Sequence, residues 1–386
     1  MGEEVEVGLL FSTSGSYRAL GQALLRGALL AIEEVNTNPE IGLRLKPTIV
    51  NPEGRLSNYR SLSHDLLCRR NIKHIIGCYT SSSRKEVLPL FEKHDGLLWY
   101  PSHYEGFETS DNIIYTGAAP NQHIVPLAQH LLQNCGRRAW LIGSNYIWAW
   151  ENNRILREAT QDAGGEILGE RYLPIGDADL EWLIHIILDD HPDFIFNTMI
   201  GESAYAFFRT FARICSERGL KQESRPLIAS CSLSEPELLE IGPGADLGHL
   251  SSSVYFETLD TPENEAFVSA WRRRFPGCGP TSADAEAAYN TVQLFARSVK
   301  AAGSQEVAAV REASASVLYI APQGRIHIDG DNHHCYLTPR IGRSIEGGRF
   351  EVIYEAKIPV RPDPYLLWHS PRVSACCKPP SKIRAL

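Results

Sequence analysis

The segment GCYTSSSRK, residues 77–85, places four hydroxyl side chains in a row between a tyrosine and a basic pair. Such a run could be a nucleophile, a phosphate-binding loop, a phosphorylation patch or a polar socket for an uncharged ligand. It contains neither the G-x-S-x-G turn of a hydrolase nor the G-x-x-x-x-G-K-[ST] frame of a phosphate-binding loop. Ser82 and Lys85 fit an S-x-x-K spacing, but the second and third boxes that accompany this motif in enzymes are missing. The segment therefore indicates binding rather than catalysis.

Short hydroxyl and aromatic side chains follow the other apolar runs of the chain as well. In an open α/β sheet, ligands bind beyond the carboxyl ends of the strands, so these residues are the candidates for a site. No lysine or arginine stands among them, although a phosphate or carboxylate ligand is usually met by one. Aromatic walls with a few fixed donors and acceptors suit a small, neutral, polar molecule. The candidates are residues 12–15, 79–81, 100–105, 144–146 with Trp148, 199–202 and 230–232.

Some of these candidates, together with their neighbours in the sequence, also have purely structural interpretations. Ser81 and Ser82 could cap the helix that follows them and present backbone N–H groups to a carbonyl oxygen. Glu105 and Glu108 could form a carboxylate pair, although we expect them to be solvated or to face a hinge. His103 is either a pocket wall or a packed, hydrogen-bonded histidine.

The histidines and cysteines indicate no metal centre. The run Asn332-His333-His334-Cys335 has metal-ligating side chains, but neighbours on a strand point to opposite faces, so a surface turn is expected. The nine cysteines are scattered without a C-x-x-C pair, which favours reduced thiols. Cys78 and Cys231, at the ends of apolar runs, are expected to be small buried side chains. We expect no metal, no cofactor and no catalytic residue.

The elements that must position these residues alternate along the chain. Residues 7–11 form an apolar run typical of a strand buried on both faces, and the leucines, alanines and valine of residues 20–35 recur at helical spacing. Similar strand–loop–helix units follow up to about residue 250, which predicts an α/β fold with parallel sheets covered by helices on both faces. Because 386 residues are too many for one ordinary core, we expect two lobes. We expect a poorly ordered tail over residues 366–386.

Composition excludes some partners. Apolar residues make up 43% and charged residues 22% of a chain with net charge -8, which is ordinary for a globular protein. Without a basic stripe, direct binding of nucleic acid is disfavoured. The first apolar run is too short for a signal peptide or a membrane span, so we expect a cytoplasmic protein without membrane contact. A periplasmic location is the alternative if an export signal has been removed.

The opening segment VGLLFSTSGSYRALGQALLRGALLAIEEVN, residues 7–36, resembles the start of the type I periplasmic-binding proteins of the branched-chain amino acid and amide class. Further segments narrow the resemblance to the cytosolic amide-sensing negative regulators of bacterial aliphatic amidase operons, whose near relatives are urea- and short-chain-amide-binding proteins of transporters. The similarity extends over roughly residues 7–365. These segments include GCYTSSSRKEVLPLFEKHDGLLWYPSHYEGFE, IIYTGAAPNQ, LIGSNYIW, IASCSLSE, YFETLDTPENEAFV, AEAAYNT, IAPQGRIHIDGDNHH and RPDPY.

The resemblance implies two doubly wound parallel-sheet lobes joined by a three-strand hinge, with the ligand in the cleft between them. The N-terminal lobe would comprise residues 5–120 plus 252–330, and the C-terminal lobe residues 121–251 plus 331–365. The family motifs place ligand-binding side chains at Tyr79, Ser81, Tyr100, Ser102, His103, Tyr146, Trp148, Ile200 and Ser232.

Several of these residues depart from the family pattern. Trp148 and Ile200 are larger than the family residues, which still favours a small ligand. Ser102 and Ser232 stand where threonine is usual and keep the hydroxyl, whereas His103 replaces a proline. In the family, the serine at position 81 would hold the amide with its hydroxyl and its backbone N–H.

The function implied by the resemblance is that of a sensor and not of an enzyme. It would bind a small neutral amide such as acetamide, or urea, and release an RNA-binding antiterminator protein that it otherwise holds silent. The alternative is the solute-binding receptor of an ABC transporter for urea or short-chain amides. A homo-oligomer is compatible with the sequence. An amino-acid receptor is a weaker third interpretation, because only Glu105 and Glu202 could accept the ammonium group and neither has a basic partner nearby for the ligand carboxylate.

Overall fold

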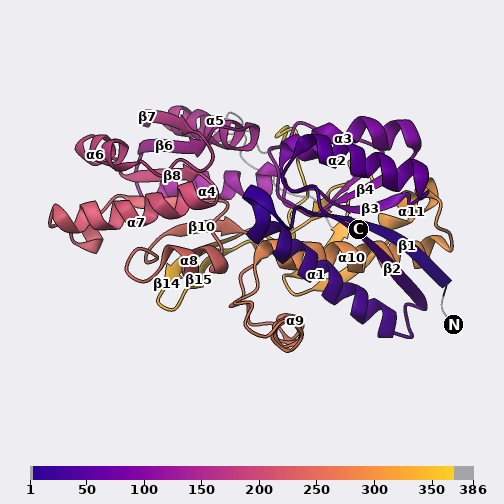
Figure 1. The fold of residues 1–386 in the computed structure, drawn as a ribbon. Helices are drawn as coiled ribbons and strands as arrows, with labels where there is room; N and C mark the ends of the chain where they lie inside the picture. The colour runs from indigo at the N-terminus through magenta and orange to yellow at the C-terminus, as the bar shows by residue number, and fades with distance from the viewer. Residues whose placement is uncertain (1–2, 369–386) are drawn as a thin grey trace, which may run out of the picture.

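The computed structural model describes residues 3–368 and contains two lobes, each built on its own sheet (Figure 1). Figure 1 shows the sheet of β1 to β4 beside α1 and α10 in one lobe, and β6 to β8 beside α5, α6 and α7 in the other. The strands are β1 (Glu3–Leu10), β2 (Leu43–Val50), β3 (His74–Gly77), β4 (Leu97–Tyr100), β5 (Ile113–Tyr115), β6 (Arg138–Ser144), β7 (Glu166–Leu173), β8 (Phe194–Thr198), β9 (Leu227–Ser230), β10 (Leu250–Ser253), β11 (Leu318–Ala321), β12 (Gly324–Ile328), β13 (Cys335–Tyr336), β14 (Arg340–Ile345) and β15 (Arg349–Glu355).

The α-helices lie between these strands, together with short 3-10 turns and one π-helical turn, η2 (Asp65–Arg69). They are α1 (Arg18–Thr37), α2 (Leu56–His64), α3 (Ser81–His94), α4 (Ile124–Asn134), α5 (Ile147–Asp162), α6 (Glu181–Asp189), α7 (Glu202–Glu217), α8 (Glu235–Ile241), α9 (Pro262–Arg274), α10 (Ala283–Ala302) and α11 (Val307–Ser314).

The first sheet is parallel, in the order β2-β1-β3-β4-β5. Along β1, Val7 and Leu9 pack into the core formed with α1 and α10, whereas Leu10 points to the core on the opposite face. Both faces of β1 are therefore buried, which explains its continuous apolar run. This part of the predicted architecture is confirmed.

The second sheet has the order β15-β14-β10-β9-β8-β6-β7. Its strands β7, β6, β8, β9 and β10 run parallel, and β14 and β15 add an antiparallel edge. On β8, Phe194 and Phe196 pack on one face and Ile195 on the other. The last two strands of the β-rich C-terminal part therefore complete the second lobe, whereas β11, β12 and β13 form a separate three-stranded antiparallel sheet that packs into the core of the first lobe.

The chain crosses between the lobes after β5, after β10 and after β13. We expected these exchanges at residues 120–121, 251–252 and 330–331. The third expected boundary lies before the actual crossing in the sequence, because β13 pairs with β12 and His334 bridges to Tyr115 in the first lobe. β10 ends at Ser253, so the second boundary also shifts slightly. The chain is irregular and forms no regular strand where it crosses between the lobes, at residues 116–119, 254–261 and 338–339.

A further segment returns to the hinge after β15. The side-chain amide of Gln122 donates to the carbonyl of Val360 at 2.8 Å, and that of Asn121 donates to the carbonyl of Arg361 at 2.7 Å. The guanidinium of Arg361 pairs with Asp329 of the first lobe at 2.7 Å. The C-terminal segment therefore ties both lobes at the hinge.

The tail expected to be poorly ordered lies largely outside the described residues. Its first residues are held, because the backbone N–H groups of Leu367 and Trp368 donate to the carboxylate of Asp363. Within residues 3–368, no helix has the length and apolar character needed to cross a lipid bilayer.

Replacing Gly27 with alanine is expected to destabilise the first lobe. A Cβ at this position would lie 1.9 Å from the carbonyl oxygen of Ala285, so α1 and α10 would have to move apart. Overpacking of this kind costs about 1–3 kcal/mol and outweighs the gain of about 1 kcal/mol in helix propensity. Urea unfolding measures the effect, with exposed Arg18→Ala in the same helix as the control. Equal midpoints for the two variants would contradict this close packing.

Candidate functional site

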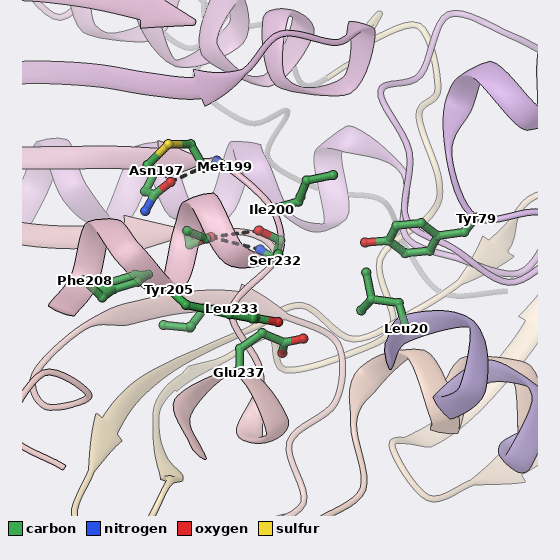
Figure 2. Close-up of a pocket in the computed structure, with 13 residues that line it drawn as sticks. Leu20, Tyr79, Asn197, Met199, Ile200, Tyr205, Phe208, Ser232, Leu233 and Glu237 are labelled. Atoms are coloured by element: carbon green, nitrogen blue, oxygen red, sulfur yellow. Dashed lines mark hydrogen bonds between the residues drawn. The ribbon is translucent and has the colours of Figure 1, made fainter. Parts of the chain in front are cut away.

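A cleft lies between the lobes at the carboxyl ends of their parallel strands. In Figure 2, Leu20 and Tyr79 of the first lobe face Ile200 and Ser232 of the second across the cavity that they line. A second cavity continues toward the hinge and shares Ser232 and Leu233 with the first. The two cavities therefore form one cleft, in the position that the sequence predicts for the ligand.

The nine predicted binding residues fall into three groups. Tyr79, Ile200, Ser232 and His103 line the cavities directly. Tyr146 and Trp148 form an aromatic wall next to His103. Ser81, Tyr100 and Ser102 are buried at the ends of β3 and β4. Their roles as ligand contacts stay predictions.

The end of β3 turns sharply before it reaches the cleft. Cys78 is fully buried, as expected, and has φ of 64°, a left-handed conformation that is uncommon for a residue with a side chain. The next residue, Tyr79, points its ring toward the second lobe (Figure 2). Its backbone carbonyl accepts a hydrogen bond from the Tyr100 hydroxyl at 2.6 Å, which holds the ends of β3 and β4 together.

The serine run after β3 caps its helix differently from the expectation. The N-cap of α3 is Thr80, whose hydroxyl oxygen accepts from the backbone N–H of Ser83 at 3.1 Å. Ser83 is completely buried and donates to the Thr80 carbonyl at 2.8 Å. Ser81 and Ser82 are therefore first-turn helix residues, not caps.

Arg84 forms a buried ionic cluster behind the cleft. Its side chain is completely buried, and its guanidinium lies 3.0 Å from the Glu105 carboxylate and 2.6 Å from that of Glu108. The rings of Tyr100 and Tyr104 each lie 4.8 Å from the guanidinium carbon. The two carboxylates are thus buried ion-pair partners, and the expectation that they are solvated is wrong.

The same cluster already uses the Ser81 hydroxyl as a hydrogen-bond donor. This hydroxyl donates to the Glu105 carboxylate, so while that bond stands it can only accept from a ligand. Burial by itself raises the pKa of Glu108, but the charges of Arg84 and Lys85 outweigh burial and hold this pKa at about 2. Lys85 of the S-x-x-K spacing pairs with Glu108 at 2.8 Å.

A wall of neutral aromatic side chains closes the hinge side of the cleft. The rings of His103 and Trp148 meet edge to face at 5.1 Å, and His123 lies 5.7 Å from His103. Burial lowers the pKa of His103 to about 4 and, with the neighbouring imidazole, that of His123 to about 3. Both rings are neutral at physiological pH. His103 is a pocket wall, and His123, which lies in the loop after β5, was missed because no apolar run directly precedes it.

Several polar atoms of this region are buried without a hydrogen-bond partner among the described residues. Because the Nε2 of His123 faces the Tyr104 carbonyl at 3.0 Å, it carries the proton and leaves Nδ1 as an acceptor. A buried polar group without a partner costs about 1–3 kcal/mol, so a cluster of them points to a ligand or water. These atoms are Ser102 Oγ, His123 Nδ1, Trp148 Nε1 and Asn197 Nδ2.

Two carboxylates that the sequence reasoning missed also line the cleft. Glu237 of α8 borders the first cavity, and Asp284, in the first turn of α10, borders the second. Burial, and then the charge of Glu237, raises the pKa of Asp284 to about 7. Glu237 lies in a helix that starts a few positions after β9, and Asp284 lies in a helix that follows α9, so a search limited to strand ends could not find them. The capping-box spacing of Ser234 and Glu237 was the available signal.

These carboxylates change the case for an amino-acid ligand. The argument against it rested on Glu105 and Glu202 as the available acceptors, without basic partners. Glu105 is paired with Arg84, and exposed Glu202 is paired with Arg209. Asp284 and Glu237 are the acidic groups that actually face the cavities.

The run from Asn332 to Cys335 is not the surface turn that was expected. His334 is completely buried, stacks on Tyr115 at 4.1 Å and shares a hydrogen bond with the Tyr104 hydroxyl at 2.5 Å. Cys335 points into the core of the first lobe. These side chains therefore fasten the hinge to the first lobe.

Three kinds of similarity place the chain among known proteins. The periplasmic binding protein domain family matches residues 5–371. The Leu/Ile/Val-binding protein homolog 6 of Brucella abortus (strain 2308) is 22% identical over 288 residues, which cover 73% of either chain.

Solved structures show the same fold. An ABC transporter solute-binding protein from R. palustris, in complex with 4-hydroxybenzoate, is 20% identical with a TM-score of 0.81 and covers 93% of this chain and 98% of its own. A branched-chain amino acid transporter substrate-binding protein from Streptococcus pneumoniae, in complex with isoleucine, is 18% identical with a TM-score of 0.77 and covers 93% and 100%.

The names of these three proteins refer to amino acids and an aromatic acid as ligands. They mention neither amide sensing nor an antiterminator. At such identities the structural likeness establishes the fold alone, and it agrees with two lobes around a cleft. Because the family match extends over nearly the whole chain, the protein belongs to the periplasmic binding protein family.

Proposed function

We propose that this protein is a solute-binding receptor that closes its two lobes on urea or a short primary amide. The observation that carries the proposal is the character of the cleft. It combines partnerless buried polar atoms with neutral imidazoles, and no lysine or arginine occurs among the described residues that line its two cavities. A carboxylate ligand would lack a cationic partner there and would face Asp284 and Glu237.

The donors and acceptors match this ligand class. Urea and primary amides offer one carbonyl acceptor and several N–H donors. His123 Nδ1 and the carboxylate of Asp284, which line the second cavity, can accept from the N–H groups, while the indole N–H of Trp148 and the hydroxyl of Ser102, both next to the cavity-lining His103, can donate to the carbonyl. Desolvated hydrogen bonds of this kind discriminate strongly against analogues that lack the polar group.

The size of the ligand limits its affinity. At a ceiling of about 1.5 kcal/mol per heavy atom, four or five heavy atoms supply at most about 6–7.5 kcal/mol. This corresponds to a dissociation constant in the range of about 1–100 µM. A nanomolar constant for acetamide or urea would therefore argue against a ligand of this size as the natural one.

The transporter role is supported by the relatives, whose names describe ABC transporter binding proteins. The second candidate is the cytosolic amide sensor that holds an RNA-binding antiterminator. It is favoured by the cysteines, because the seven that the structure describes are unpaired and Cys68 and Cys278 are exposed. Fractionation of the native cell, followed by an antibody against the protein, separates the two: a periplasmic pool supports the receptor and a purely cytosolic pool the sensor.

Calorimetric titration tests the ligand class. The panel is urea, formamide, acetamide, propionamide, butyramide, leucine and 4-hydroxybenzoate. We expect micromolar binding of urea or of one amide, and none of 4-hydroxybenzoate. Leucine is the informative competitor, because its ammonium group could use Asp284 and Glu237. If leucine binds more tightly than every amide and urea, the proposal is wrong.

Replacing Ser102 with alanine is expected to weaken binding of the best ligand by about 1–3 kcal/mol, because the variant loses a donor that has no other partner. Protein stability should stay the same or rise slightly. Ser63→Ala is the matched control, since the Ser63 hydroxyl is also buried and partnerless but lies in α2, whereas Ser102 lies between Pro101 and His103, which line the second cavity. Equal affinities of the two variants would remove Ser102 from the site.

A further inference from the structure

We propose that His64, Cys68 and His94 form a binding site for a thiophilic divalent metal such as Zn²⁺ on the surface of the first lobe. One potential ligand atom from each of the three side chains lies within 4.8 Å of the others. None of the three residues lines the cavities of the cleft, and the site does not depend on the proposed solute.

Three local structures bring the side chains together. His64 is the last residue of α2, and His94 is the last residue of α3, which packs against α2. Cys68 follows His64 by four residues, a spacing that places two side chains on one helix face. It lies in the π-helical turn η2, and such turns occur frequently at functional sites. The rings of His64 and His94 meet edge to face at 5.9 Å.

The ligand set selects a class of metal. Two imidazoles and one thiolate suit Zn²⁺ and its neighbours in the first transition row rather than Mg²⁺ or Ca²⁺, which prefer oxygen. Zinc bonds of about 2.0–2.3 Å in tetrahedral geometry place ligand atoms about 3.3–3.7 Å apart. The three side chains must therefore close by about 1 Å. Because His64 and Cys68 are exposed and His94 is partly buried, side-chain rotation can supply this movement. Water would take the fourth position.

The charged groups of the hollow that His64 and His94 line permit a cation. Arg60 and Arg69 line it, but Arg60 pairs with Glu86 at 3.4 Å and Arg69 with Asp65 at 3.7 Å. The carboxyl end of α3 also lies here, and the partial negative charge of a helix carboxyl end favours a cation. Lys93 and Lys73, whose ammonium group donates to the backbone carbonyl of His94 at 2.8 Å, are neighbours that oppose binding.

The proposed metal site is separate from the cleft. Ser81 begins α3 at the cleft and His94 ends it at the metal site. At 1.5 Å per residue, the two ends lie about 20 Å apart. Metal binding should therefore leave the affinity for the cleft ligand unchanged, so failure of one proposal does not entail failure of the other.

The test is titration with Co²⁺, whose thiolate complex has a charge-transfer absorption that Zn²⁺ lacks. The background variant is Cys278→Ser/Cys376→Ser/Cys377→Ser, which removes the other exposed described cysteine and the adjacent pair near the C-terminus. We expect one equivalent of Co²⁺ to bind with the thiolate band and to be displaced by Zn²⁺. Cys68→Ser should abolish the band.

Replacing either histidine identifies the remaining ligands. His64→Ala and His94→Ala should each weaken Zn²⁺ binding at least about tenfold. His185→Ala, in α6 of the second lobe, should leave it unchanged. Circular dichroism of each variant verifies the fold, and His64→Gln and His94→Gln replace any alanine variant that fails to fold. Absence of the band in the background variant, or its persistence in Cys68→Ser, would overturn the proposal.

Discussion

Replacing Arg84 with methionine is expected to lower the free energy of unfolding by about 3–5 kcal/mol. The variant removes the buried cation of Glu105 and Glu108 and leaves them only Lys85, whose side chain is 40% exposed, among the described residues that pair with them; breaking a buried pair in this way is strongly destabilising. It also removes the guanidinium from between the rings of Tyr100 and Tyr104. Urea unfolding followed by circular dichroism measures the change.

The matched control is Arg60→Met. Arg60 pairs with Glu86 at 3.4 Å, but its side chain is 63% exposed, so water and salt screen the pair. Such pairs contribute about 0–1 kcal/mol. The triple variant Arg84→Met/Glu105→Gln/Glu108→Gln removes the uncompensated charges and should recover part of the loss. If Arg84→Met costs no more than Arg60→Met, the ionic cluster does not hold the ends of β3 and β4 together.

Asp284→Asn is expected to weaken binding of the cleft ligand about 10- to 100-fold at pH 8, and to remove most of its pH dependence. A hydrogen bond to a charged acceptor contributes about 1.5–3 kcal/mol, and the variant loses that charge. Because burial and Glu237 raise the pKa of Asp284 to about 7, the wild-type affinity for urea or an amide should increase as the pH rises through 7. Calorimetry between pH 5.5 and 8.5, in steps of about half a pH unit, covers this pKa range.

The stability of the unliganded protein should fall as the pH rises through 7, whereas the affinity for the ligand rises. Between the unfolded pKa of 3.8 and the folded value of about 7, the folded state binds more protons at Asp284 than the unfolded state. The contribution of this group is fully present below the unfolded pKa and is lost as the pH rises through the folded one. Asp284→Asn should therefore flatten this decline while it weakens binding.

Two further variants distinguish a ligand contact from a general charge effect. Asp260→Asn changes an exposed carboxylate in the crossing before α9 and should alter neither profile. Glu237→Gln removes the charge that raises the pKa of Asp284, so the midpoint of the binding profile should move to lower pH. A binding profile without pH dependence between pH 6 and 8 (about one unit on each side of the expected midpoint) would exclude Asp284 as an acceptor.

Much of the architecture is predictable because it depends on local patterns. The apolar run at Val7 to Leu10 and the helical periodicity of residues 18–37 each show in a short window. The alternation of such units indicates parallel sheets, whose carboxyl ends converge. Tyr79, Ile200 and Ser232 were found by this rule, and they face one another across the first cavity.

The missed cleft residues depend on contacts between distant segments. His123, Glu237 and Asp284 come from a hinge crossing and from two helices, and sequence windows show each of them as an ordinary polar position. Their burial arises when the lobes approach, and burial is the main cause of the shifted pKa values of His123 and Asp284. The acidic side of the cleft could not be predicted from the sequence for the same reason.

The sequence by itself determined the fold class and the two lobes and predicted a neutral, aromatic site at the strand ends, because backbone periodicity and turn chemistry are local properties. Only the tertiary structure decided which polar groups are free to meet a ligand. Ser81 donates to Glu105, whereas the Ser102 hydroxyl and the Trp148 indole have no partner among the described residues. Hydrogen-bond satisfaction depends on which side chains lie within about 3 Å, and that distance is set by packing between lobes rather than by order along the chain.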